Sequence, residues 1–338
     1  MKIGCVYSKY HYGDPARGAS LEAKAFYPAL QQITDQASVL WIDEFLDKKD
    51  ELQQRIFDFA SAEEPQLLFF TLMNDELAVR TLEDLKKLTT TINWFCDDYW
   101  RFDTFTQKVA PHFHYAVTTD KYYLKEYERI GYSNVVLSQW AAFDVAEPKE
   151  LDRRDFLYDI SFVGINSDYR QWLSQQLKRR GYRIQCFGYG WESGPVTYEQ
   201  MAEICSRSRI NLNMSNSVCY DMRCLATSPR SLTRTLGSLV CKGKKTAESV
   251  KARNFEIPAF GGFQLTPYVP GLEDFYEIGR EIAVYTSLDD LLRQIDYYTA
   301  HEDERLEIVR RGYERTVRDH RYTDRFQNII EHVQLCHA

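Results

Sequence analysis

A glutamate upstream of a glycine pair, with two cations just before it, is the most informative chemical pattern in the sequence. Glu256 belongs to a helix-like stretch that ends at Gly261 and Gly262 and runs into a strand-like segment. A carboxylate placed there can accept two charge-assisted hydrogen bonds from the 2′ and 3′ hydroxyls of a ribose. Lys251 and Arg253 are candidates to face the phosphates of the same nucleotide, and Gly261 and Gly262 are counted with them among the predicted nucleotide-binding residues. The residues alone leave a second interpretation open, a helix with an ordinary glycine cap and solvated charges.

A glycine turn between a strand-like run and a helical pattern is a second candidate phosphate site. Gly164 follows DISFV at 159–163, and Arg170 lies near the start of the next helical pattern. Backbone N–H groups and the positive end of a helix dipole favour phosphate at such a turn. An ordinary strand-to-helix turn explains the same residues, so this alternative also stays open. The aromatic run FGYGW at 187–191 either borders a base or packs at the rim of the sheet.

Carboxylates at the end of another strand-like run are candidates for acceptor chemistry. Asp97 and Asp98 follow TTINWFC, and a carboxylate at the C-terminal end of a strand can act as a general base toward a hydroxyl group. We expect one of the two to face a ligand and the other to serve structure. His11 and Asp14, in the loop YHYGDPARG, are further candidates to contact a transferred group or an acceptor.

The sequence offers little for a metal ion. His112 and His114 would share a face if they lay on a strand, but no further ligand follows at metal-binding spacing, so zinc is not expected. Asp97 and Asp98 form a plain pair instead of the Asp-X-Asp pattern that clamps a cation. We therefore predict no metal site and no bound cofactor.

The composition indicates a globular, reduced and soluble chain. The 338 residues correspond to about two domains, and 44% of them are hydrophobic, enough for packed cores. Nucleic acid is not expected as a partner, because the formal charge is −7 and binding to a duplex requires a positively charged surface. The eight cysteines are scattered without a CxxC motif, which is typical of reduced thiols. Neither a signal peptide nor an apolar run long enough for a membrane is recognisable, so we predict a cytoplasmic protein.

Short strand-like runs alternate with helical patterns, which is typical of parallel sheets with right-handed crossovers. The predicted strands are 2–8, 39–42, 67–72, 91–96, 115–118, 159–163, 183–188, 210–214 and 262–266. The predicted helices are 21–33, 45–62, 75–88, 121–130, 170–180, 198–206, 247–259, 288–300, 302–319 and 323–334.

A polar stretch at 141–154 interrupts this alternation, and we place a domain boundary after residue 145. The predicted fold is α/β, with two doubly wound Rossmann-like domains, 1–145 and 146–320, that face each other across a cleft. In open α/β sheets, ligands bind beyond the C-terminal ends of the strands. The segment 216–245 fits neither pattern, and we interpret it as a long excursion over the cleft.

The last third of the chain carries longer motifs: FEIPAFGG at 255–262, VPGLEDFY at 269–276, the strand-like EIAVYTS at 281–287, and ERLEIVRRGYERTVRDHRYTDR at 304–325. With these motifs the chain resembles the C-terminal domain of CgeB-type, or spore-maturation-protein-like, glycosyltransferases. These are enzymes of the two-Rossmann-domain GT-B superfamily. Weaker similarity upstream covers TTINWFCDDYWRFD, DISFVGINSDYR and INLNMSNS.

This resemblance implies a glycosyltransferase that takes a sugar from a nucleotide-sugar donor, bound by the C-terminal domain, to an acceptor hydroxyl. A carboxylate at the position of Glu256 binds the donor ribose in related retaining enzymes. Those enzymes often carry a second glutamate eight residues earlier, and Glu248 has that spacing here. Retention is therefore expected more than inversion, without a metal ion. The final helix, within 321–338, is expected to cross back to the first domain.

Two other classes of protein fit the same residues. A nucleotide-sugar epimerase or hydrolase would use the Glu256 pocket without an acceptor groove. A non-catalytic module would bind a sugar nucleotide or a glycan without turnover.

Overall fold

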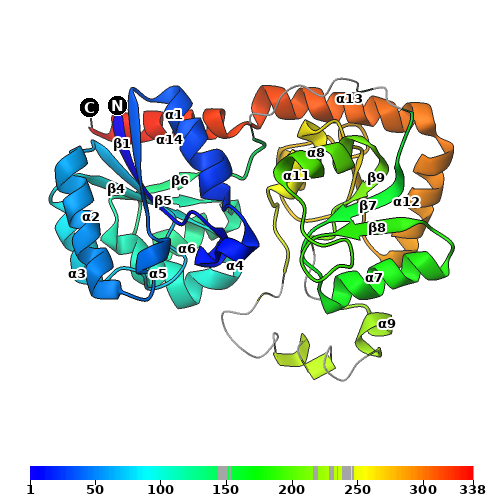
Figure 1. The fold of residues 1–338 in the computed structure, drawn as a ribbon, viewed down its shortest axis with the longest axis horizontal. Coiled ribbons are helices and arrows are strands. Elements are labelled where there is room, and N and C mark those ends of the chain that lie inside the picture. Colours follow the sequence, from blue (N-terminus) through cyan, green and yellow to red (C-terminus); the bar gives the residue numbers. More distant parts are fainter. Residues whose placement is uncertain are drawn as a thin grey trace. The chain divides into compact units, whose positions relative to one another are not determined.

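The chain divides into two compact units, which Figure 1 shows in a ribbon of the computed structural model. The structure describes residues 1–143, 151, 154–215, 220–227, 232–233, 235–237, 245 and 247–337. The first unit combines Met1–Gln139 with Tyr322–Ala338, and the second is Trp140–Arg321. The observed boundaries thus follow Gln139 and Arg321, whereas the predicted ones followed residues 145 and 320.

A parallel six-stranded sheet forms the centre of the first unit, with the strand order β2-β1-β3-β4-β5-β6. Its strands are β1 (Lys2–Tyr7), β2 (Gln36–Trp41), β3 (Leu67–Phe70), β4 (Thr90–Phe95), β5 (Tyr115–Thr118) and β6 (Val135–Leu137). All residues of β3 and β5 are buried, as expected for parallel strands that are covered on both faces. The chain moves to opposite sides of β1 when it forms β2 and β3, so the C-terminal ends of β1 and β3 make the switch point of this sheet.

Helices cover the first sheet. They are α1 (Tyr27–Ile33), α2 (Lys49–Glu63), α3 (Val79–Lys86), α4 (Asp98–Arg101), α5 (Gln107–Val109), α6 (Leu124–Arg129) and α14 (Tyr322–His337). The last helix, α14, belongs to this unit through an aromatic core. The ring of Phe326 lies 4.9 Å from that of Phe26, 5.5 Å from Phe69 and 5.9 Å from Trp94, between ring centroids. All four rings are buried, so α14 is part of the hydrophobic core of the first unit.

The second unit has a parallel five-stranded sheet with the order β11-β10-β9-β7-β8. Its strands are β7 (Tyr158–Val163), β8 (Ile184–Phe187), β9 (Ser208–Leu212), β10 (Gln264–Pro267) and β11 (Ala283–Tyr285). Its helices include α7 (Asp168–Arg179), α8 (Tyr198–Ser206), α9 (Met222–Leu225), α11 (Arg253–Ala259), α12 (Leu288–Ala300) and α13 (Glu302–Asp319).

Several predicted elements differ from the observed ones in informative ways. The predicted helix 21–33 begins as a π-helical turn, Glu22–Phe26, before α1. The predicted helix 247–259 is helical only from Arg253. The strand β6 was not predicted, because it has three residues and only one of them is buried. Most of the excursion 216–245 lies outside the described residues. Within the described part of the chain, no helix combines the length and the apolar character needed to span a membrane.

Candidate functional site

Glu256 lies in the first turn of α11 with its side chain buried, and Arg253 neutralises it. An Nη1 atom of Arg253 lies 2.9 Å from Oε2 of Glu256, with the two side chains 26% and 8% exposed. The same Nη1 atom contacts the sulfur atom of Met201. The opposite charge of the guanidinium offsets the cost of burying the carboxylate. Glu256 can thus present a carboxylate oxygen to a hydroxyl donor.

A network of amide and hydroxyl groups fixes the first turn of α11 at the C-terminal ends of β9 and β10. Thr266 Oγ1 accepts hydrogen bonds from the side-chain amides of Asn213 and Asn254, each at 3.2 Å. Asn254 Oδ1 accepts the backbone N–H of Lys251 at 2.9 Å. All three side chains in this network are buried. Lys251 is therefore positioned at the head of α11, on the edge of the sheet where open α/β folds bind ligands.

Three further charges lie at this edge. Lys245 Nζ lies 2.7 Å from Oε2 of Glu248, whose side chain is 10% exposed. Burial lowers the pKa of Arg170 from its usual value, the negative charge of Glu248 opposes this shift, and the positive charge of Arg253 adds to it. Arg170, Glu248 and Arg253 thus interact electrostatically. We call Arg170, Lys245, Glu248, Arg253 and Glu256 the donor-edge cluster, which carries three cations and two carboxylates.

Arg170 also ties together the ends of two strands. Its Nε donates to the carbonyl of Met214 at 2.7 Å, beyond β9, and its Nη1 donates to the carbonyl of Ile165 at 2.7 Å, beyond β7. Its guanidinium carbon lies 5.2 Å from the centre of the Phe162 ring. The side chain therefore holds the turn before α7 against β9, which is a positioning role in addition to the predicted phosphate contact.

Gly188 permits the turn after β8 to approach the turn at Gly164 closely. A Cβ atom on Gly188 would meet the carbonyl oxygen of Gly164 at 2.3 Å, and the indole N–H of Trp191 donates to that same oxygen at 2.9 Å. Phe187 is buried in the sheet. The aromatic run 187–191 thus packs against the Gly164 turn, which favours the packing interpretation over a base-binding one.

Gly261 and Gly262, counted above among the predicted nucleotide-binding residues, lie in the turn after α11, and their contact with a ligand stays a prediction. Both lie at the C-terminal end of α11, away from Lys251 and the first turn of the helix. Gly261 has a φ of 69°, and Gly262 donates its N–H to the carbonyl of Ile257 at 3.0 Å to close the helix. A Cβ on Gly262 would lie 2.7 Å from Nδ2 of Asn211. These glycines make the turn into β10.

In the first unit, the structure distinguishes the two neighbouring aspartates. Asp98 is 1% exposed and accepts hydrogen bonds from the hydroxyls of Thr118, Thr106 and Tyr127 at 2.6, 2.7 and 2.9 Å. Burial raises the pKa of Asp98 to about 6, although these hydrogen bonds lower it. Three hydroxyl groups enclose this carboxylate, which favours Asp98 over Asp97 for the structural role that was expected of one of the two. Asp97 is half-buried with a φ of 62° and stays a prediction for the acceptor side.

The loop after β1 exposes His11. Its ring stacks on Tyr12 with 5.3 Å between centroids. Partial burial lowers the pKa of His11 from its usual value, and the cations of Lys24 and Arg17 add to the effect. Asp14 caps a short 3-10 helix by accepting the N–H of Ala16 at 2.9 Å. Asp14 therefore orders the loop, while the role of His11 stays a prediction.

The histidine pair of the first unit does not share a face. His112 ends a 3-10 helix, and its Nδ1 lies 2.5 Å from a carboxylate oxygen of Glu83. His114 uses its Nδ1 to accept the backbone N–H of Thr91 at 3.1 Å. Across the described residues, no group of three or more His, Cys, Asp or Glu side chains is arranged to hold a metal ion. Independence of metal ions stays a prediction.

Sequence reasoning missed a glutamate at the switch point of the first sheet. Glu22 lies in the π-helical turn, and burial raises its pKa, whereas hydrogen bonds from its own backbone, Ser20 and Thr71 oppose the shift. Thr71 directly follows β3. π-Helical turns occur frequently at functional sites, but the local sequence gives no sign of this one. Only the contact between Glu22 and Thr71, far apart in the chain, reveals it.

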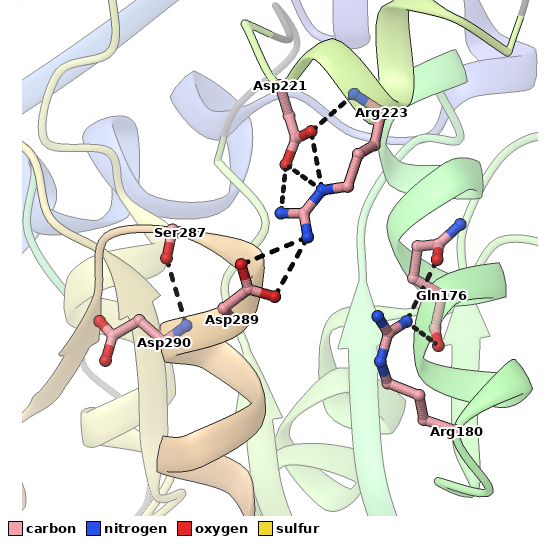
Figure 2. Close-up of polar contacts among 7 residues, drawn as sticks. All are labelled: Gln176, Arg180, Asp221, Arg223, Ser287, Asp289 and Asp290. Atoms are coloured by element: carbon pink, nitrogen blue, oxygen red, sulfur yellow. Dashed lines mark hydrogen bonds and ion pairs between the residues drawn. The ribbon is translucent and has the colours of Figure 1, made fainter.

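The segment after β9 is anchored to the second unit by an arginine, shown in Figure 2. Arg223 of α9 forms ion pairs with Asp221 at 2.8 Å and with Asp289, in the first turn of α12, at 3.1 Å. Ser287 caps α12 by accepting the N–H of Asp290 at 3.2 Å. The part of the excursion at 220–227 is therefore tied to the first turn of α12, which follows β11.

Comparison with known proteins agrees with this geometry. Residues 170–331, just under half of the chain, match a family model described as "Glycosyl transferase-like". Every member of the donor-edge cluster lies within the matched segment. A search of curated proteins finds no match.

Solved structures show the same fold. Sucrose-phosphate synthase from Thermosynechococcus elongatus has a TM-score of 0.64 and 10% identity, with 99% of both chains covered. HepE from Anabaena, solved in complex with UDP-glucose, has a TM-score of 0.62 and 12% identity, again with 99% of both chains covered. A glycosyltransferase from Rickettsia africae has a TM-score of 0.60 and 10% identity, over 99% of this chain and 98% of that one. The predicted α/β class and the GT-B fold are confirmed, and the family match confirms the prediction of a glycosyltransferase-type enzyme.

Proposed function

We propose that the chain transfers a glycosyl group from a nucleoside diphosphate sugar to an acceptor hydroxyl, as the resemblance to CgeB-type glycosyltransferases implies. The observation that carries this proposal is the donor-edge cluster, which lies at the C-terminal edge of the second sheet and inside the segment that matches the glycosyltransferase-like family. An anionic diphosphate requires a positive environment, and a ribose diol requires a fixed hydrogen-bond acceptor. The cluster offers both.

Glu256 accepts the two ribose hydroxyls. Arg253 pairs with this carboxylate at 2.9 Å from Oε2 and contributes its positive charge toward the diphosphate. Lys251, at the head of α11, supplies a second cation. Arg170, near the N-terminal end of α7, adds a guanidinium charge beside the same strand ends, whereas the N–H of Gly164 already donates to the carbonyl of Phe187 at 2.8 Å.

The reaction we propose is retaining and needs no metal ion. The bond between the sugar C1 and the diphosphate oxygen breaks, and a bond between C1 and the acceptor oxygen forms on the same face of the sugar. The acceptor proton passes to the leaving diphosphate, whose negative charge the cations of the donor-edge cluster offset. Glu248, eight residues before Glu256 and paired with Lys245, has the spacing that supports retention.

Asp97 orients the acceptor hydroxyl in this proposal. It follows β4 at the C-terminal edge of the first sheet, half-buried, whereas its neighbour Asp98 is enclosed by hydroxyl groups. Because the leaving group takes the proton, Asp97 has to accept a hydrogen bond without removing the proton completely.

A product analysis tests the proposed reaction. The full chain is incubated with UDP-glucose, UDP-N-acetylglucosamine and GDP-mannose, each with and without a panel of simple glycoside acceptors. The proposal expects nucleoside diphosphate release that depends on the acceptor, together with a glycosylated product. Release without acceptor indicates a hydrolase, and interconversion of the sugars indicates an epimerase. Binding of the nucleotide without any release indicates a non-catalytic module. Each of these three outcomes contradicts the proposal.

A further inference from the structure

The second unit contains a small cavity at the edge of its sheet opposite the donor-edge cluster. Ser208 and Arg209, where β9 begins, line it together with Arg305 of α13 and Phe156. The cavity has about 10 Å³ of room for the centre of a water-sized sphere, which corresponds to about one water molecule. It is thus separate from the proposed nucleotide site and much smaller than a nucleotide.

A fully buried arginine points donors at this cavity. Arg305 is 0% exposed, and its Nη1 donates to the carbonyl of Tyr298 at 2.8 Å. Its Nε and Nη2 donate no hydrogen bond among the described residues. The carboxylate of Glu302 lies 3.8 Å from Nη2, too far for a hydrogen bond. A buried donor without an acceptor lowers the free energy of unfolding, so we expect a further partner for this guanidinium.

A second arginine shares the cavity. The Nε of Arg209 is also buried without a hydrogen-bond partner in the described part of the chain. The guanidinium carbons of Arg209 and Arg305 lie 5.7 and 5.1 Å from the centre of the Phe156 ring. Both cations therefore contact the same ring by cation–π attraction, and both line the cavity.

Neighbouring carboxylates are shared with other arginines. Glu302 also lies 3.7 Å from Arg154, which in turn pairs with Asp303 at 2.8 Å. Like charges act on Arg305 itself, because Arg209 and Arg154 both disfavour its positive charge. One distant carboxylate therefore does not balance the two guanidiniums that line the cavity.

We propose that this cavity binds a monovalent anion of halide size, such as chloride, between Arg209 and Arg305. An anion accepts hydrogen bonds and donates none. It therefore suits a site where Nε and Nη2 of Arg305 and Nε of Arg209 have no acceptor among the described residues. Its negative charge also offsets the excess of positive charge there. The size of the cavity excludes a nucleotide and disfavours a tetrahedral phosphate. The anion would join the start of β9 to α13 and so stabilise the second unit.

Bromide replaces chloride chemically and can be located by its anomalous X-ray scattering. Crystals of the full chain are grown or soaked in sodium bromide, and an anomalous map is calculated. We expect a bromide peak within about 3.5 Å of the guanidinium nitrogens of Arg209 and Arg305. A map with bromide only elsewhere on the surface, or with a water molecule in the cavity, overturns the proposal.

Thermal unfolding of the full chain supplies a solution test. Sodium chloride and bromide should raise the melting temperature by a few degrees in a saturable way, since a ligand at ten times its Kd favours the native state about elevenfold. Sodium gluconate at the same ionic strength should not. The Arg209→Gln variant should lose the halide-specific rise, whereas Arg207→Gln, an arginine that pairs with Asp155 at 3.2 Å, should keep it. Equal responses to halide and gluconate in the unmodified chain overturn the proposal, even if the variants fail to fold.

Discussion

The carboxylates at the strand ends of the second sheet are held by cations, whereas those of the first sheet are held by hydroxyl groups. Glu256 pairs with Arg253 and Glu248 pairs with Lys245. Asp98 instead accepts hydrogen bonds from three hydroxyls, and burial raises its pKa to about 6.

Because of this difference, the two edges suit ligands of different charge. Cations in excess at the second edge favour an anionic diphosphate. An edge with hydroxyl groups and carboxyl groups of raised pKa suits an uncharged ligand, such as an acceptor sugar. Glu22 strengthens this contrast, because burial raises its pKa as well and its hydrogen-bond partners include Ser20 and Thr71.

The largest expected effect concerns the stability of the first unit. Asp98 has a folded pKa of about 6 instead of 3.8, so folding favours its protonated form. The stability from this group is fully present below the unfolded pKa and is lost as the pH rises through 6, by about 3 kcal/mol in total. Asp98→Asn lacks this titration. Urea unfolding at pH 4 and pH 7 should therefore show the variant gaining about 2 kcal/mol relative to the unmodified chain, because pH 4 already lies slightly above the unfolded pKa.

The exposed Asp103→Asn provides the control for this measurement, because it keeps Asp98 intact. Its stability relative to the unmodified chain should stay constant between the two pH values. If the relative stability of Asp98→Asn is also the same at both pH values, the pKa of Asp98 is not raised in the folded chain.

The next effect concerns catalysis at the first edge. Asp97→Asn should lower kcat about tenfold and raise the acceptor KM, while the affinity for the nucleotide stays unchanged, because Asp97 only orients the acceptor. A general base typically contributes 10²–10⁴-fold. Steady-state kinetics with both substrates varied distinguishes the two roles. A loss of kcat in that larger range would show that Asp97 acts as the general base. Unchanged kcat and KM would show that Asp97 has no role in acceptor binding, and His11 and Glu22 would be the next residues to test.

A smaller effect is expected from Arg253→Ala at the second edge. Removing this cation should weaken binding of a nucleoside diphosphate about tenfold, and binding of the bare nucleoside much less, because only the diphosphate carries the matching charge. The control is Arg293→Ala, an exposed arginine of the same unit. Titration calorimetry with UDP and uridine provides the comparison. Equal losses of affinity for UDP and for uridine would show that Arg253 does not contact the phosphates.

The smallest effect should follow from chelation. If the cations of the donor-edge cluster alone offset the charge of the leaving diphosphate, EDTA leaves the turnover of the full chain unchanged. Loss of activity in EDTA, with recovery after addition of Mg²⁺ or Mn²⁺, would show that a metal ion shares this task.

Local patterns were sufficient to predict much of the fold. The strand Tyr115–Thr118 was predicted with its observed bounds, because the run YAVT is apolar and buried throughout. The helix Tyr198–Ser206 was also predicted correctly, and the capping box of Thr197 and Gln200 explains its sharp start. By contrast, β6 is short and half-exposed, so its sequence carries too little hydrophobic signal.

The candidate site was less predictable because its chemistry depends on distant contacts. The proximity of Arg170 to Glu248 and Arg253 arises only when β7, β9 and α11 assemble. The sequence presents Asp97 and Asp98 as equivalent, and only the hydroxyl network from Thr106, Thr118 and Tyr127 separates them. Glu22 resembles a surface residue of a helix until Thr71 is brought beside it.

The most direct test of the account is the affinity of the full chain for UDP, measured by calorimetry in the unmodified protein, in Glu256→Gln and in Glu273→Gln. Glu256 is buried beside Arg253, whereas Glu273 is an exposed glutamate of the same unit. A charge-assisted hydrogen bond contributes about 1.5–3 kcal/mol. The account therefore predicts that Glu256→Gln weakens UDP binding about ten- to hundredfold while Glu273→Gln leaves it unchanged. Equal affinity in all three proteins, with the fold intact, would contradict the assignment of the donor ribose to Glu256.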